Sequence, residues 1–319
     1  MALLEFSRSL PGRGRQMGQG LSERELLLTK LDTLTKSEQA RKIIETYSQG
    51  LLLDREDLEK RFLMSASPHM TYHEVMDVLI RQGASRIMED PDYGVFATNI
   101  LHRKIGDEVS GMGVHSFSDA VRMGQEEGIL TDKLREFVEA NETRLNIAID
   151  ESYNELFTYF GLATIYDRYL LRHPTKRFVF ERPQYLFMRV ACGVVNDIER
   201  AILFYKLMAS FSYMPGSPTL FNAGTKNPQL SSCFLVDSPN DSLEDIYRRY
   251  TDVAKLSKHG GGIGISYSKV RSRGSLIRGT NGRSSGIGPW LKTLDSSVAA
   301  VNQGGRRKGA CCATAPKQG

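Results

Sequence analysis

The sequence contains little cysteine. Four cysteines occur in 319 residues, at Cys192, Cys233, Cys311 and Cys312, and six histidines are scattered along the chain. These residues follow no metal-ligand spacing, which argues against a zinc site and against a disulfide scaffold. We therefore predict that the thiols are reduced at rest and that the chain binds no metal.

Long hydrophobic runs are also absent. No stretch approaches the roughly 18–20 apolar residues of a membrane span, and the start, MALLEFSRSLPGRGR, lacks the order of basic end, apolar run and cleavage site of a signal peptide. We predict a cytoplasmic protein without membrane association. Residues 1–21, rich in Gly and Arg, indicate a disordered leader. The 40% hydrophobic content is ordinary for a globular chain with room for about two domains.

Acidic residues are scarce near the carboxyl end. The net charge is only +5, but ten Lys or Arg residues stand against one acid, Asp295, between Lys258 and Lys308. Arg271, Arg273 and Arg278 are interleaved with Gly, which suits the close approach of an anion. Aromatic residues are scarce among these basic residues, so phosphate is favoured over nucleic acid. A basic nucleic-acid-binding protein stays an alternative that only this charge asymmetry supports.

The apolar spacing is helical from about Ser22 to Ser212. A capping box at Ser22 and Glu25 predicts the first helix. Further helices are predicted over residues 71–88, 92–105, 131–149 and 199–212.

Strands and helices alternate beyond Ser212, which predicts an α/β arrangement for this half. Asp241, with Glu244 three residues later, is expected to cap a helix that ends at Gly260–Gly262. Strands are predicted over 229–236, 262–270 and 274–279, a turn over 279–282 and a helix over 289–301.

Three features stay open when read from residue chemistry alone. The glycines of KHGGGIGIS form either a helix cap or a phosphate site. Asp241 and Ser242 either cap a helix or bind a ribose hydroxyl. Cys233 reads as a buried structural cysteine, although the polar Ser231 and Ser232 before it are unusual for a core strand.

Five motifs in one order change this interpretation: SPTLFNAGTKNPQLSSCFLV, DSLEDIY, GGIGISYSKVRSRGS, GTNG and NQGGRRKGA. With them the chain resembles the large, catalytic subunit of ribonucleotide reductase, most similar to class I, from about Asp92 to Pro316. The resemblance implies an α+β fold: a helical N-terminal domain, then the first part of a ten-stranded α/β barrel. The implied divisions are a leader (1–21), a helical region with a degenerate or absent ATP-cone (22–108), the helical reductase domain (109–212) and the barrel part (213–319).

The resemblance also implies site residues. Cys233 falls on the first of the two cysteines that reduce the ribonucleotide, and Ser217, Ser232 and Gly262 fall on substrate-binding positions. The implied effector-binding residues are Asp241, Ser242, Leu243, Lys258, Arg271, Arg278 and Gly279. Asn302, Gln303 and Arg307 fall on the specificity loop, where either Arg307 or Lys308 contacts the base. Cys311 and Cys312 are expected to be buried filler beside the barrel.

The implied function is reduction of ribonucleoside diphosphates by a dithiol pair and radical chemistry. No cofactor is bound directly: a dNTP or ATP effector occupies the specificity site, and a metal-containing small subunit supplies the radical. Thioredoxin or glutaredoxin is the implied reductant, and the helices near the specificity site are the implied homodimer contact.

The radical-carrying cysteine and the second redox cysteine of the family have no counterpart in the 319 residues. We therefore expect a split large subunit, inert until a separate chain supplies the C-terminal half of the barrel. Nothing before Ser22 resembles the basic, Gly-containing β-hairpin with which the family's ATP-cone begins, so we also expect no overall-activity regulation by ATP and dATP. Two alternatives stay open: a non-catalytic nucleotide-binding regulator derived from a reductase, and part of a cobalamin-dependent class II reductase.

Overall fold

The computed structural model describes residues 23–67, 69–301 and 308–315. The chain divides into two compact units, Met1–Ile100 and Leu101–Gly319. The predicted leader and Ser22 of the predicted capping box lie outside the described residues, and the predicted domain boundaries stay predictions. Within the described ranges, no helix combines the length and apolar composition needed to cross a bilayer.

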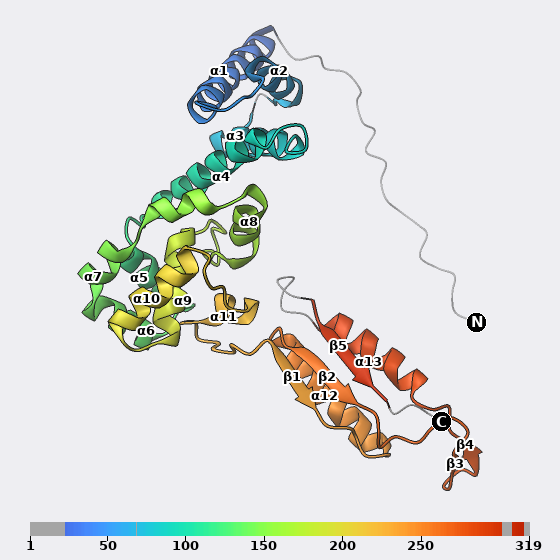
Figure 1. Cartoon of the computed structure of the whole chain (residues 1–319). Helices are drawn as coiled ribbons and strands as arrows, with labels where there is room; N and C mark the ends of the chain where they lie inside the picture. Colours follow the sequence, from blue (N-terminus) through green and yellow to red (C-terminus); the bar gives the residue numbers. More distant parts are fainter. Residues whose placement is uncertain (1–22, 68, 302–307, 316–319) are drawn as a thin grey trace. The chain divides into compact units, whose positions relative to one another are not determined.

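The first unit is helical throughout its described residues (Figure 1). Its helices are α1 (Glu23–Tyr47), α2 (Arg55–Ser65), α3 (Tyr72–Ser85) and the first half of α4 (Asp92–Gly111). Thr71 and Glu74 form a capping box at the start of α3. Leu58, Phe62 and Phe96 are fully or almost fully buried, so these helices share a packed core. The helices predicted over 71–88 and 92–105 are confirmed, with shifted ends.

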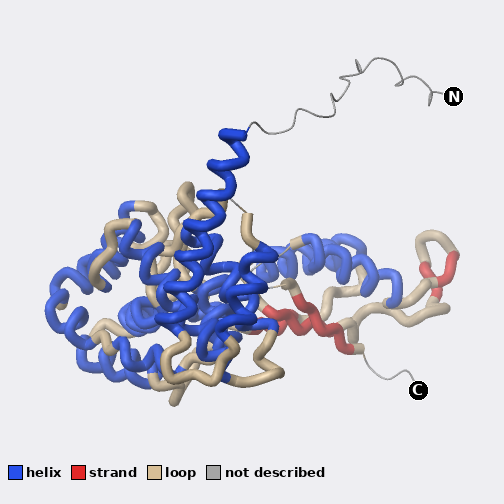
Figure 2. Tube along the Cα trace, turned by 90° about the horizontal axis from the view of Figure 1, so that it is seen from above, coloured by secondary structure: helices blue, strands red, loops and turns tan. Residues whose placement is uncertain are grey.

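Helices also form the first part of the second unit, as the blue tube of Figure 2 shows. They are α5 (Phe117–Glu126), α6 (Asp132–Ala140), α7 (Glu142–Ala148), the 3-10 helix η1 (Glu151–Leu156), α8 (Tyr159–Thr164), the π-turn η2 (Ile165–Tyr169), α9 (Pro183–Val194), α10 (Ile198–Ala209) and α11 (Ser217–Asn222). Every residue of α9 from Pro183 to Cys192 is buried. This helix is therefore the centre of the helical core.

The single helix predicted over residues 131–149 is wrong, because the chain forms α6 and α7 instead. The break is at Asn141, whose φ of −125° is not helical. Its side-chain Nδ2 donates to the carbonyl of Phe137 at 2.8 Å. The amide thus satisfies a free carbonyl at the end of α6, a local bond that competes with helix continuation.

The rest of the second unit is built on a parallel three-stranded sheet. Its strands are β1 (Cys233–Val236), β2 (Gly262–Ser266) and β5 (Ala310–Thr314), in the order β1-β2-β5. Two helices, α12 (Leu243–Lys258) and α13 (Gly288–Ala300), follow β1 and β2 respectively in the chain. Parallel strands joined through helices are the expected pattern of an α/β barrel segment.

Both helices pack on one face of this sheet (Figure 1). The shared core consists of Ile246, Tyr250, Val253, Ile263, Ile265, Tyr267, Leu294 and Val298. Side chains alternate across a strand, so Gly262 and Gly264, on either side of Ile263, face away from the helices. Cys233, in register with Gly262, faces the same way. That open face carries the candidate thiol.

The strand predicted over residues 229–236 has only its last four residues in the ladder. Gln229 explains the late start, because its Oε1 accepts from the backbone N–H of Ser231 and its Nε2 donates to the carbonyl of Ser231. This side chain occupies backbone groups that a longer strand would need. The polar run before Cys233 is therefore a loop that delivers the cysteine to the sheet.

The prediction that Asp241 caps a helix is also wrong. The N-cap of α12 is Ser242, whose side chain accepts from the backbone N–H of Asp245. Asp241 instead accepts from Arg271 Nε at 2.6 Å. The carboxylate is one residue too early for the cap and pairs with a cation.

The glycine-containing turn predicted over residues 279–282 is confirmed. It joins β3 (Leu276–Ile277) to β4 (Gly282–Arg283) as an antiparallel hairpin, and Asn281 has a positive φ of 54°. The strands predicted over 262–270 and 274–279 are shorter than expected. The helix predicted over 289–301 is confirmed as α13, with a proline in its first turn.

Candidate functional site

Cys233 begins β1 and its side of the sheet is exposed. It lies in register with Gly262 of β2, and the backbone N–H of Gly262 donates to the carbonyl of Ser232 at 2.8 Å. A Cβ added at Gly216 would lie 2.6 Å from Ser232 Oγ, so the chain just before Ser217 runs directly beside Ser232. The structure thus groups the four residues that the sequence assigned to the thiol and the substrate.

The open face around Cys233 has almost no side chains on its central strand. Gly262 and Gly264 occupy this face of β2, and Leu235 leans over Gly264, where an added Cβ would lie 2.8 Å from Leu235 Cδ2. Leu235 itself is 94% exposed. A thiol flanked by glycines on an uncovered apolar face has room for a ligand beside it.

Cys311 and Cys312 do not behave as one pair of fillers. Cys311 is half-buried against the helix-facing core, and burial raises its thiol pKa. Cys312 is exposed and, in register with Gly264, shares the open face with Cys233. The prediction that both are buried is therefore wrong for Cys312, because adjacent residues of a strand point to opposite faces.

Cys192 differs from the sheet cysteines. It is buried in α9, and desolvation raises the pKa of its thiol to about 12. A thiolate is the reactive form of cysteine, so Cys192 is chemically inert at neutral pH. Among the described residues, no group of three or more His, Cys, Asp or Glu side chains could hold a metal ion.

A second site surrounds the start of α12. A cavity of about 260 Å³ is lined by Asp241, Ser242, Leu243, Ile246, Val270, Arg271, Ile277, Ser284 and Trp290. The volume is slightly below the roughly 300–1,000 Å³ typical of small-molecule sites, so it accommodates part of a nucleotide. Four of the predicted effector residues converge here from segments about 30 positions apart in sequence: Asp241, Ser242, Leu243 and Arg271.

Several bonds hold the two segments of this cavity together. Besides the Arg271–Asp241 pair, Lys269 Nζ donates to Asp237 at 2.8 Å, and the backbone N–H of Lys269 donates to Ser238 Oγ at 3.1 Å. Asp241 and Arg271 are each about a third exposed, so both can still meet a ligand. The acid, the hydroxyl and the guanidinium offer acceptors and donors for a sugar and an anion.

Trp290 is a cavity residue that was not predicted from the sequence. Trp290 is half-buried, and its ring meets Tyr247 edge-on with centroids 6.1 Å apart. Its carbonyl accepts from the hydroxyl of Tyr250, whose pKa is raised by burial, so that hydroxyl stays a donor. One feature of the sequence could have indicated Trp290: it is the single tryptophan of the chain and lies in a helix that follows the basic hairpin.

The other predicted effector residues lie elsewhere. Arg278 and Gly279 are exposed in the β3–β4 loop, immediately after the cavity residue Ile277. Lys258 ends α12, the 16-residue helix that Ser242 caps, and thus lies about 24 Å along the helix axis from Ser242 at 1.5 Å per residue; Lys258 does not line the cavity. The structure does not bring Lys258 to the cavity. Asn302, Gln303 and Arg307 lie outside the described residues.

These observations define a class: an all-α domain followed by the opening strands of an α/β barrel. Two family models match the chain in this order, "Ribonucleotide reductase, all-alpha domain" over residues 155–228 and "Ribonucleotide reductase, barrel domain" over residues 231–316. Together they span half of the chain. The chain therefore belongs to the ribonucleotide reductase large-subunit family, and the predicted α+β fold with an incomplete barrel is confirmed.

Curated relatives support the same family. The chain is 35% identical over 296 residues to the ribonucleoside-diphosphate reductase subunit alpha of Chlamydia pneumoniae, covering 82% of this chain and 28% of that protein. It is 37% identical over 263 residues to the large chain of Schizosaccharomyces pombe, covering 80% and 32%. It is 38% identical over 251 residues to the large subunit of Arabidopsis thaliana, covering 76% of this chain and 30% of that protein. The chain thus spans about a third or less of these relatives.

Proposed function

We propose that the chain is the part of a ribonucleotide reductase large subunit that carries the first redox thiol, part of the substrate surface and the allosteric specificity site. In this role it takes part in reducing ribonucleoside diphosphates to deoxyribonucleotides. The observation that carries the proposal is the convergence of Asp241, Ser242, Leu243 and Arg271 on one cavity, in the same α/β segment that exposes Cys233. A thiol site and an effector site in one α/β segment fit a regulated reductase better than either site alone.

The proposed chemistry at Cys233 is a two-electron reduction. The Cys233 thiol and a second thiol from outside these 319 residues are oxidised to a disulfide. Their two electrons and two protons replace the ribose hydroxyl group by hydrogen and release it as water. The glycines of β2 leave space for the sugar next to Cys233, and Ser217 and Ser232 supply hydroxyl groups beside it. A radical from a metal-containing small subunit starts the reaction, and thioredoxin or glutaredoxin reduces the disulfide afterwards.

The proposed effector is a deoxynucleoside triphosphate or ATP. Asp241 and Ser242 would meet the sugar hydroxyl, while Arg271 and Arg278 would meet the phosphates, because guanidinium groups match phosphate oxygens. Trp290 would face the bound nucleotide. Since the cavity is small for a whole nucleotide, a second copy of the chain packed near α12 would complete the site.

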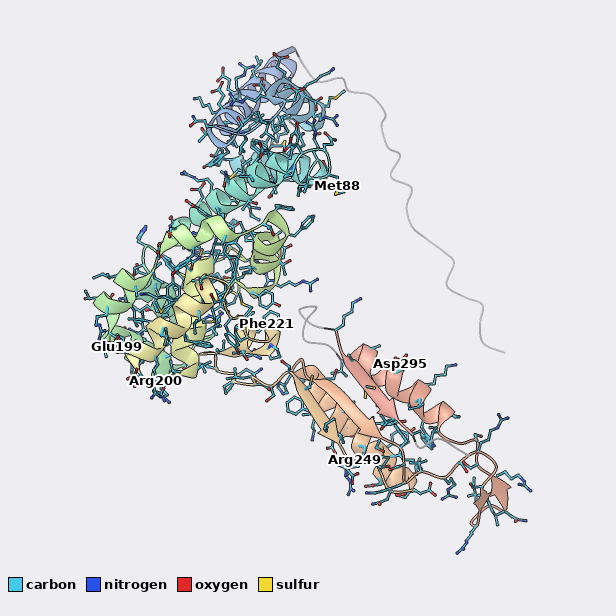
Figure 3. All side chains as sticks on the ribbon, in the orientation of Figure 1. Met88, Glu199, Arg200, Phe221, Arg249 and Asp295 are labelled. Carbon is cyan, nitrogen blue, oxygen red and sulfur yellow. The ribbon has the colours of Figure 1, made fainter. Side chains whose placement is uncertain are left out.

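The single tryptophan gives a direct test. Titration of the 319-residue chain with dNTPs and with ATP should change Trp290 fluorescence in a saturable way, and Arg271→Gln should weaken the affinity about tenfold or more, as expected for a charge-assisted bond. Arg200→Gln, the same charge change on an exposed residue of α10, is the matched control (Figure 3). An unchanged fluorescence at saturating nucleotide, or equal affinity in the two variants, would contradict the effector site.

The hypothesis of a split large subunit is tested separately. The split-subunit hypothesis expects a native polypeptide of 35.8 kDa that gains reductase turnover only with a second chain bearing the rest of the barrel. Intact-mass measurement of the native large subunit distinguishes this from one longer polypeptide. Turnover that is lost in Cys233→Ser but kept in Cys192→Ser would support the assigned role of Cys233.

A further inference from the structure

Tyr169 contacts the helix that carries Ser217 at two points. Its hydroxyl lies 2.8 Å from Ser217 Oγ, and its ring stacks on Phe221 with centroids 4.5 Å apart and planes 13° apart. Ser217 and Phe221 are four residues apart on α11, so both lie on one side of that helix. One side chain therefore contacts two successive turns of α11 on the same side.

The segment that presents Tyr169 is held in an unusual conformation. Tyr169 ends the π-turn Ile165–Tyr169, a form that adds a residue to a helical turn and often occurs at functional sites. Tyr166 in this turn donates to Glu108 at 2.6 Å, and Arg172 donates to the carbonyl of Tyr166 at 2.8 Å. In a continuous α-helix, one residue more or less rotates a side chain by about 100°. The π-turn thus decides where the Tyr169 hydroxyl points.

The other end of α11 is fixed by a buried arginine. Arg189 is 1% exposed, donates to the carbonyls of Leu220 and Ala223 and pairs with Glu181 at 2.6 Å. A six-residue helix is too short to be stable by itself in water. Tyr169 at one face and Arg189 at the carboxyl end therefore help to hold α11, and with it Ser217, in place, together with the bonds of Thr219 and Asn222 to the loop before β1.

We propose that Tyr169 is a positioning residue for the substrate-binding hydroxyl of Ser217. This inference rests on the proposed function, in which Ser217 contacts the ribonucleotide. A serine hydroxyl has one donor and two acceptor positions. The bond to Tyr169 uses one of them and selects one rotamer, which leaves the remaining positions of Ser217 oriented for the substrate.

The first test is kinetic and uses the assembled reductase. Tyr169→Phe keeps the ring that stacks on Phe221 and removes only the hydroxyl. We expect KM for the ribonucleoside diphosphate to rise about three- to tenfold, the weight of one hydrogen bond, with kcat within about twofold. Tyr213→Phe removes a hydroxyl from an exposed tyrosine that does not touch α11 in the described contacts, and it should leave both constants unchanged.

A double-mutant cycle separates positioning from general stability. If Tyr169 acts through Ser217, then Tyr169→Phe combined with Ser217→Ala should raise KM no further than Ser217→Ala alone. Additive effects, or an unchanged KM in Tyr169→Phe while Ser217→Ala raises it, overturn the inference. An unchanged KM in Ser217→Ala refutes the substrate role of Ser217 and the inference with it.

The second test needs no turnover and uses the 319-residue chain. In a Ser217→Cys variant, the Tyr169 hydroxyl should donate to the introduced thiolate and lower its pKa. Adding Tyr169→Phe should then move the pH midpoint of alkylation at this position upward by about half a pH unit or more. An unchanged alkylation profile means that Tyr169 does not contact position 217, which overturns the inference whatever the chain's function is.

Discussion

Cys233 and Cys312 present their thiols on the same open face of the three-stranded sheet. They stand on the two outer strands, two residues apart in register, with Gly262 and Gly264 between them. Strand spacing and residue rise place their Cα atoms about 12 Å apart. A disulfide needs Cα atoms within about 7 Å, so the two cysteines cannot form one in this arrangement. Cys312 is therefore a second accessible thiol near the proposed reaction centre, but it is too far from Cys233 to form a disulfide with it.

This placement predicts an order of thiol reactivity. With iodoacetamide at pH 8, Cys233 and Cys312 should be labelled in the folded chain, Cys311 more slowly, and Cys192 only after denaturation. The physical reasons are exposure of the first two and the burial that raises the pKa of the other two. Peptide mass spectrometry measures the labelling, and Cys312→Ser assigns the signal within the peptide that also contains Cys311. Protection of Cys312 in the folded chain would contradict the open face.

Residue types located the sites but could not fix every role. Cys233 read alone is a core cysteine, and only the ordered motifs turned it into a redox candidate. The sequence predicts that Asp241 caps the helix, but the cap is Ser242, because either side chain can cap a helix. The choice depended on Arg271, 30 residues later, which takes the carboxylate of Asp241. A contact between distant segments is not contained in local sequence.

At the scale of elements, α9 and the segment after α11 approach unusually closely. A Cβ added at Gly193 would lie 2.4 Å from the backbone nitrogen of Gly224 and 2.7 Å from the carbonyl carbon of Ala223. Backbone atoms cannot move aside as a flexible side chain can. Glycine at position 193 is therefore what lets the segment that leads to β1 lie against the helical core.

This contact predicts the effect of one methyl group. Gly193→Ala should destabilise the fold by about 1–3 kcal/mol through overpacking. Gly106→Ala is the matched control, since Gly106 also lies in a helix but an added Cβ there meets nothing within 4 Å, and it should be neutral or slightly stabilising. Urea unfolding monitored by circular dichroism measures both. Equal stability of the two variants would show that the chain after α11 does not rest on α9.

Element types were predictable where the apolar spacing was long, and element ends were not. α3, α4 and α13 followed from helical spacing. The predicted strand over residues 229–236 is four residues too long, because the side chain of Gln229 bonds to the backbone of Ser231. The predicted helix over residues 131–149 continues through Asn141, where α6 ends. In both cases a polar side chain competes with the backbone ladder, and its rotamer decides the outcome.

At the scale of the whole molecule, charge is divided between the two ends of the chain. Three arginines of the first unit are paired with its own carboxylates: Arg41 with Glu59, Arg61 with Asp57, and Arg86 with Asp57 and Glu89. In the second unit, the segment from Lys258 to Lys308 has one acid. Within this segment Lys269 and Arg271 pair with Asp237 and Asp241, which still leaves an excess of cations there, so nucleotide binding is expected at the basic segment.

The whole chain should therefore bind one nucleotide, not two. Equilibrium dialysis of the 319-residue chain with dATP should give one site per chain, and Asp241→Asn combined with Arg271→Gln should remove it. Arg61→Gln, which breaks an ion pair of the first unit, should leave the binding unchanged. A second nucleotide is not expected, because the sequence predicts a degenerate or absent ATP-cone over residues 22–108. Tight dATP binding that survives the double substitution would place an activity site in residues 1–100 and would contradict the predicted absence of overall-activity regulation.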